Sequence, residues 1–267
     1  MKKLSIFAAV LAALAFTACG GNKSAQTAEE SDSLKSFEQE QVEAKIKMEL
    51  DSLAAEVGKL KKLPFMETGD KGLKLTDQEK KVKPTYLLDP AIAENATTLA
   101  EKYRLLSALS VDKNIAALYD MPTDAYEAAI SKLAADINDP SFKEIEDAST
   151  IFETGQKLYD AMNENGRINY FWQLVASSLV EQIYVISQNT DKFITAFDDD
   201  SAASITFRIV LLSDAVTRLA NYDPEFEPVA NAVNALYPLN AINVEQLKAQ
   251  LEETKEKIGE ARAELIK

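Results

Sequence analysis

The chain has 267 residues, of which 46% are hydrophobic and 27% charged, enough apolar material for one large or two small globular domains. The formal net charge of -14 argues against nucleic-acid binding and against adhesion to anionic lipid headgroups, because both need clustered Lys and Arg. There is no histidine, which excludes Ser-His-Asp and Cys-His catalysis and every His-containing zinc site. Glycine and proline are sparse, at eight each, which favours helices over turn-rich β structure.

The first 18 residues have the organisation of a secretion signal. Lys2 and Lys3 precede the apolar run Leu4–Phe16. At about 1.5 Å per residue, a helix over this run would be roughly 20 Å long, while the hydrocarbon core of a bilayer is about 30 Å thick. The run is therefore too short to span a membrane comfortably and suits the apolar region of a signal peptide.

Residues 16–19 read FTAC, an apolar residue and two small ones before the only cysteine of the chain. This stretch resembles the lipobox of bacterial lipoproteins, with Phe16 in place of the usual Leu, and the two glycines that follow are similar to those of Bacteroidetes lipoproteins. The resemblance implies cleavage before Cys19 and attachment of fatty acyl chains such as palmitate to it. It places the protein at a membrane of the cell envelope, with the outer membrane expected. Several acyl chains fit this role, because one chain alone anchors only marginally.

Two alternatives stay open at this end of the chain. The first is a plain secretory signal in which Cys19 is incidental. The second concerns the side of the membrane: acidic residues close behind the cysteine can mark export to the cell surface in Bacteroidetes lipoproteins, and the first acidic residue here, Glu29, comes late. The choice between a periplasmic and a surface-exposed protein is therefore open.

The remainder divides into a tether and one helical domain. Residues 19–32 carry no large apolar side chain, so they cannot bury enough surface to offset their ordering entropy and are predicted to be flexible. The predicted domain spans 33–267 and has four parts: a long N-terminal helix (33–63), a connector (64–88), a helical core (89–243) and a C-terminal helix (244–267).

The two ends of this domain have the pattern of amphipathic helices. Apolar residues recur three or four positions apart, with charged residues between them. They are Val42, Ile46, Leu50, Leu53, Val57 and Leu60 near the start, and Leu247, Leu251, Ile258, Ala261 and Leu265 near the end. We expect these two helices to pack antiparallel on each other within the domain; pairing between molecules is the alternative.

Capping residues divide the segment between them into further helices. No stretch alternates with the period of two that a strand requires, so the predicted fold class is all-α, a multi-helix bundle. The predicted helices are one near Thr76–Lys81, one from Pro90 to Leu109 capped by Asp89, a short one from Asp112 to Tyr119, one from Thr123 to Ile137, and then Ser141–Asn163, Arg167–Gln188, Ser201–Asn221 and Glu225–Tyr237.

Two of these helices are apolar on most faces, so they are predicted to be buried on more than one side and to form a central antiparallel pair. They cover residues 168–186 and 205–216 and are linked near Ile194. Counting outwards from the link puts Glu181 and Arg208 at the same level. Because a buried unpaired charge costs several kcal/mol, we expect these two residues to form an ion pair.

The candidate site for a small molecule is the aromatic run near the start of the first central helix. Tyr170 and Trp172 could stack on a sugar or an apolar ligand, and Arg167 could meet an anion. The competing interpretation is that these aromatic residues are core. The acidic run at 198–200 has oxygen ligands suitable for a hard cation, but it lacks the pattern of a calcium loop and is interpreted as a helix start. No metal and no cofactor are predicted.

Three short segments are similar to the Asp-Ser/Thr-apolar motif of Bacteroidetes O-glycosylation. They are DSL at 32–34, DSL at 51–53 and DSA at 200–202. The resemblance implies glycan attachment at Ser33, Ser52 and Ser201.

These features predict a lipid-anchored, extracytoplasmic helical binding or interaction module of the cell envelope without catalytic activity, for which a protein of the envelope is one candidate partner. The alternative is an envelope carrier for an apolar or glycan ligand, held in a helical pocket near Trp172. A closed core with an exposed apolar groove along 42–60 or 247–265 would favour a protein partner, and a deep cavity beside Trp172 would favour the carrier.

Overall fold

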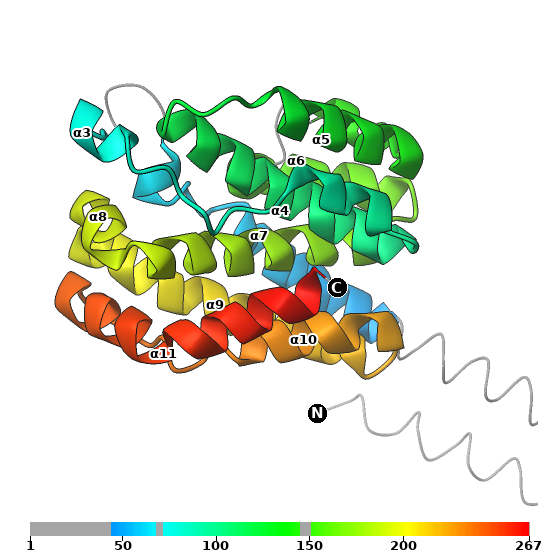
Figure 1. The fold of residues 1–267 in the computed structure, drawn as a ribbon. Coiled ribbons are helices and arrows are strands. Elements are labelled where there is room, and N and C mark those ends of the chain that lie inside the picture. The colour runs from blue at the N-terminus through cyan, green and yellow to red at the C-terminus, as the bar shows by residue number, and fades with distance from the viewer. Residues whose placement is uncertain (1–43, 68–71, 145–150, 267) are drawn as a thin grey trace, which may run out of the picture. The chain divides into compact units, whose positions relative to one another are not determined.

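The computed structural model describes residues 44–67, 72–144 and 151–266, and all regular structure in these ranges is helical (Figure 1). The prediction of an all-α, multi-helix fold is confirmed. The chain divides into two units, Met1–Met48 and Glu49–Lys267. In the first unit the described residues, 44–48, are helical, and the second unit begins with the helical residues 49–57. Everything below concerns the second unit.

Among the described residues, nine further α-helices follow residues 49–57 in this unit, interspersed with short 3₁₀ turns. The 3₁₀ turns are η1 (Pro64–Met66), η3 (Pro90–Asn95), η4 (Pro140–Glu144), η6 (Ile194–Ala196) and η7 (Pro224–Phe226). The α-helices are α3 (Asp77–Lys80), α4 (Leu99–Leu118), α5 (Asp124–Ile137), α6 (Ile151–Glu164), α7 (Ile168–Gln188), α8 (Thr190–Phe193), α9 (Asp199–Ala220), α10 (Glu227–Asn234) and α11 (Val244–Leu265), of which α3 and α8 are single turns.

Helix starts follow local capping chemistry. Thr76 caps α3 through a capping box with Glu79, which confirms the short helix predicted there. Asp198 caps α9 and accepts a hydrogen bond from the backbone N–H of Ser201, which confirms the capping interpretation of the acidic run. At the other end of a helix, Gly166 has a φ of +67°, and this left-handed residue ends α6 as the sequence predicted.

The helix predicted from Pro90 to Leu109 is wrong in its bounds. Asp89 and Pro90 start only the 3₁₀ turn η3. The longer helix, α4, begins after Thr98. The Thr98 hydroxyl oxygen accepts a hydrogen bond from the backbone N–H of Glu101, and the Glu101 carboxylate accepts one from the backbone N–H of Thr98. This reciprocal cap satisfies two otherwise unpaired N–H groups, so it decides where the helix starts.

The separate helix predicted to start at Asp112 does not exist. Asp112 lies inside α4, is fully buried, and its carboxylate accepts a hydrogen bond of 2.7 Å from the backbone N–H of Leu88. An Asp is a common helix start, but its side chain can equally bond a backbone group brought to it by another segment. Which of the two occurs depends on the fold.

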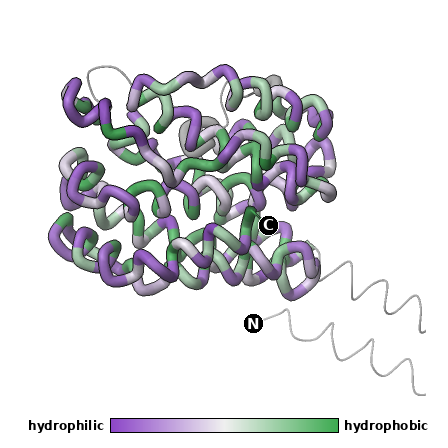
Figure 2. The backbone as a smooth tube through the Cα atoms, viewed as in Figure 1, coloured by the Kyte–Doolittle hydropathy of each residue, from purple (hydrophilic) through white to green (hydrophobic). Residues whose placement is uncertain are grey.

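Helix α7 lies at the centre of the bundle and packs against α4, α6, α9, α10 and α11 (Figure 1). Its apolar residues from Phe171 to Ile186 are almost all without exposed surface. Figure 2 shows hydrophobic residues along α4 and α7 and hydrophilic ones on the outward turns of the outer helices. The prediction that the segment 168–186 is central is confirmed.

Helix α9 differs from the prediction, because only one of its faces is buried. Its link to α7 consists of α8 and η6, centred on Ile194 as predicted, and α9 returns alongside α7. However, Phe207 and Val210 are each 48% exposed. An apolar residue type does not by itself state which face of a helix is covered.

The contacts of the two terminal helices that lie within the described residues are with other helices of the bundle. Asp51 accepts a hydrogen bond of 2.6 Å from Tyr159 of α6, and Glu49 accepts one of 2.6 Å from Arg218 of α9. Helix α11 packs mainly on α7 and α10. The described contacts therefore place the two terminal helices against other helices, and the expected direct pairing is not among them.

Candidate functional site

An open apolar groove of about 480 Å³ lies between α9 and the helix that ends at residue 57. Leu53 and Glu56 form one wall. The floor and the other wall come from α9 and from the segment after α10. The lining residues outside Leu53 and Glu56 are Phe207, Val210, Leu211, Ser213, Asp214, Thr217 and Tyr237.

The periodicity of α9 produces this surface. Its core face carries Ile205, Ile209, Leu212 and Val216, all at or below 1% exposure. Residues three or four positions apart on a helix share a face, so the row at 207, 210, 214 and 217 points away from that core. Phe207 and Val210 thus present apolar surface next to Tyr237, which is 50% exposed.

The charged residues that line the groove are both acidic. Glu56 forms an ion pair of 2.5 Å with Lys59, and Asp214 forms one of 2.9 Å with Arg218. Neither cation is itself a lining residue. All four side chains are well exposed, and such pairs contribute about 0–1 kcal/mol each.

Trp172 does not face a groove or the solvent. Its side chain has no exposed surface and is flanked by Phe171, with ring centres 5.1 Å apart, and by Tyr159 at 6.2 Å. Among the described residues its indole N–H has no hydrogen-bond partner. Trp172 is a core residue, which is the competing interpretation of the aromatic run.

Arg167 and Tyr170 lie on a different side of α7 from Trp172. The Tyr170 ring stacks on Tyr103 of α4, with centres 4.7 Å apart and planes 8° from parallel, and the Arg167 guanidinium carbon lies 5.9 Å from its centre. Residues two positions apart on a helix point in nearly opposite directions, so Tyr170 and Trp172 cannot line one site. The predicted three-residue ligand site is therefore wrong as a unit.

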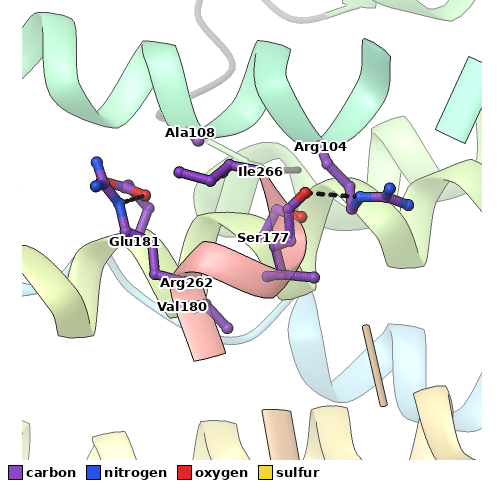
Figure 3. A pocket seen from close by; sticks show the side chains of 8 residues that line it. Arg104, Ala108, Ser177, Val180, Glu181, Arg262 and Ile266 are labelled. Atoms are coloured by element: carbon purple, nitrogen blue, oxygen red, sulfur yellow. Dashed lines mark hydrogen bonds and ion pairs between the residues drawn. The ribbon is translucent and has the colours of Figure 1, made fainter. Parts of the chain in front are cut away.

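A buried polar cluster ties α11 to the centre of the bundle. Glu181 of α7 accepts hydrogen bonds from Arg262 of α11, from Nε at 2.8 Å and from Nη2 at 2.8 Å. Nearby, Arg104 of α4 donates from Nε to the backbone oxygen of Leu265 at 3.0 Å, at the end of α11 (Figure 3). The space among these residues does not admit a water molecule.

The predicted Glu181–Arg208 ion pair is wrong in its cation. Glu181 pairs with Arg262, a residue more distant along the chain. Arg208 is buried elsewhere and donates from Nη2 to the backbone oxygen of Lys61. Glu181 and Arg208 are at similar distances along the chain from the link between α7 and α9. However, α11 packs on α7 and brings Arg262 to Glu181 instead.

Asp112 completes the cluster as a second buried acid. Its Oδ2 lies 3.5 Å from Nη2 of Arg262, so two carboxyl groups share one guanidinium. Burial, followed by the charge of Glu181, raises the pKa of Asp112 well above its ordinary value. The cluster is dry, enclosed and joined to α11, features that indicate a role in stability.

The remaining predicted positions divide into two groups. Cys19 and Ser33 lie outside the described residues. Ser52 is exposed, whereas Ser201 is partly covered and its hydroxyl is engaged with Asp198 at the start of α9. Within the described ranges no group of three or more acidic residues or cysteines is placed to hold a metal ion.

Comparisons with known proteins add no family. No protein-family model, no curated protein and no solved structure matches the chain. Among the described helices none has the length and apolar character needed to cross a membrane.

Proposed function

We propose that this protein is a non-catalytic interaction module of the cell envelope, anchored by lipid at Cys19, which binds a protein partner through the groove. The observation that carries the proposal is the exposed apolar surface of Phe207, Val210 and Tyr237 beside Leu53. Clustered apolar surface of this kind, rimmed by polar residues, is typical of interaction sites.

The alternative, a carrier for an apolar or glycan ligand, has less support. The carrier hypothesis requires a pocket beside Trp172, and this side chain is enclosed by Phe171 and Tyr159. The groove lies instead on α9, and it is open along its length, whereas small-molecule sites cover most of the ligand surface.

The anchoring part of the proposal is supported by the FTAC sequence at residues 16–19. A tether after Cys19 would allow the helical unit to reach a partner at some distance from the membrane. Lipid anchoring also keeps the groove close to one membrane, which raises the effective concentration of any partner in that membrane.

Site-specific photocrosslinking in intact cells tests the interaction. A photoreactive amino acid at Val210 is expected to give a discrete crosslinked product, because this residue lines the groove. The same amino acid at Ile242, which is 70% exposed and outside the groove, is the matched control. Phe207→Ser should abolish the product formed from position 210. Products of equal yield from both positions, or a product at 210 that survives Phe207→Ser, would contradict the proposed function.

A further inference from the structure

We propose that the groove accepts a cationic amphipathic helix of about three turns, lying along α9. This inference rests on the proposed function and names the kind of partner. It follows from the shape of the groove, from the absence of a sheet edge in the described residues, and from the sign of the charges at the rim.

The shape of the groove matches a helix. Phe207, Val210, Asp214 and Thr217 form one row along α9, and this row from 207 to 217 spans about 15 Å at about 1.5 Å per residue. Leu53 and Glu56, three positions apart on one helix, form the opposite wall. A helix laid between two such walls places its own i, i+3 and i+7 side chains against them, the usual ridge-and-groove arrangement.

The groove offers an extended peptide few partners for its main-chain hydrogen bonds. Peptides that add as strands obtain much of their affinity from main-chain hydrogen bonds to an exposed sheet edge. The described residues contain no strand, and the backbone groups along α9 are bonded within the helix. The contacts that the groove offers are side-chain contacts, which suits a ligand whose own backbone bonds are satisfied internally.

The rim selects for positive charge. Glu56 and Asp214 are the charged lining residues, paired with Lys59 and Arg218 respectively. Arg218 also pairs with Glu49 at 2.6 Å, so these five side chains carry one net negative charge. Exposed pairs of this kind are weak enough for a partner's Lys or Arg to join or replace. The net charge of -14 attracts a cationic partner over a longer range as well.

The same charges disfavour a second copy of this chain. In a two-fold pairing the groove of one copy meets the same groove of the other, which would bring the acidic rims together. They also disfavour an anionic lipid surface, which repels carboxylates. The occupant that satisfies both the apolar floor and the acidic rim is a helix with an apolar stripe and basic flanks.

Three labelled peptides of equal length test the partner class. One has leucines at helical spacing with lysines elsewhere, the second replaces every lysine with glutamate, and the third has the composition of the first in scrambled order. The full-length chain in nanodiscs of zwitterionic lipid is titrated into each peptide, with empty nanodiscs as background, and anisotropy is read. We expect the Leu/Lys helix to bind at least tenfold tighter than both controls, and to bind less tightly as salt is raised.

Matched variants locate the binding. Phe207→Ser and Val210→Ser should each weaken the Leu/Lys peptide by about tenfold, whereas Tyr222→Ser and Ile242→Ser, at exposed positions outside the groove, should leave it unchanged. The partner class is overturned by equal binding of the Glu peptide, by loss of affinity in all four variants alike, or by self-association that Phe207→Ser removes. If the peptide fails while the crosslink from position 210 in cells persists, the partner class is wrong and the proposed function stands.

Discussion

At the scale of single residues, the buried ionic cluster is the most demanding feature of the chain. Glu181 and Asp112 share Arg262 in a place without water. Taking charges from water is costly, and the cost is offset only where the hydrogen bonds are good and the charges nearly balance. Two acids and one guanidinium balance if one acid keeps its proton, which agrees with the raised pKa of Asp112.

Loss of the Arg262 guanidinium should lower the free energy of unfolding more than loss of its main acceptor, Glu181. Arg262→Met leaves two facing acids without a cation, and we expect a loss of about 3–5 kcal/mol in the free energy of unfolding. Glu181→Gln should lower the free energy of unfolding by less, because the Asp112 carboxyl group, 3.5 Å from Nη2 of Arg262, can ionise and pair with the guanidinium in place of Glu181. Urea unfolding at neutral pH measures both. Equal losses for the two variants would contradict this account of the cluster.

Asp112→Asn should remove a pH dependence from the stability. The folded pKa of Asp112 is raised, so its contribution is fully present below the unfolded pKa of about 3.9 and is lost as pH rises towards the folded value. Asn keeps an acceptor for the Leu88 N–H and carries no proton to lose. The wild-type chain should therefore lose stability relative to the variant as the pH rises above the unfolded pKa of about 3.9.

Thermal unfolding of both proteins across this range measures the difference. Subtracting one curve from the other cancels the titration of distant groups, which serve as the internal control. A difference that does not change with pH would show that Asp112 binds no extra proton in the folded state.

At the scale of elements, helix starts are set by caps that local sequence supplies. Thr98 and Glu101 form a complete capping box at the start of α4, whereas Thr123, before α5, makes no side-chain cap bond. These two threonines form a matched pair for measuring the value of a cap.

Thr98→Ala should lower the free energy of unfolding by about 1 kcal/mol, because it leaves the N–H of Glu101 without its acceptor. Thr123→Ala, the control, should cost clearly less. Chemical denaturation of both variants tests this. A larger loss at Thr123 would mean that the cap at Thr98 does not determine the stability of α4.

At the scale of the whole molecule, two properties belong to distant parts of the chain: the groove and the proposed anchor. The groove joins Leu53 and Glu56 to residues more than 150 positions later, such as Phe207, so no local segment contains it. The anchor belongs to the FTAC stretch, far from the groove in sequence.

Cys19→Ser should abolish incorporation of labelled fatty acid and release the protein from the membrane fraction. Several acyl chains at about 0.8 kcal/mol per buried CH₂ account for stable anchoring, and no described helix is suited to span a membrane. Phe207→Ser, which alters only the groove, is the control and should leave fractionation unchanged. A Cys19→Ser protein that is still acylated and sediments with membranes would disprove the lipoprotein assignment.

The sequence by itself determined the fold class, most helix positions and several caps. Helix formation depends on residues three and four apart and on caps within one turn, so the patterns around α5, α7 and α9 carried that information locally. The capping role of Asp198 and the left-handed stop at Gly166 belong to the same class, because each depends on its immediate neighbours.

Only the tertiary structure decided which faces are covered and which charges meet. An Asp at position 112 could either cap a helix start or accept a hydrogen bond in the core. It does the latter, because the fold places the backbone N–H of Leu88 next to its carboxylate. Glu181 could pair with any arginine that a packed helix brought within reach, and α11 supplied Arg262 in place of Arg208. The sequence of α9 predicts burial on more than one side, whereas Phe207 and Val210 are each 48% exposed. Periodicity shows which residues share a face of a helix, but not how many of its faces are covered by neighbouring helices.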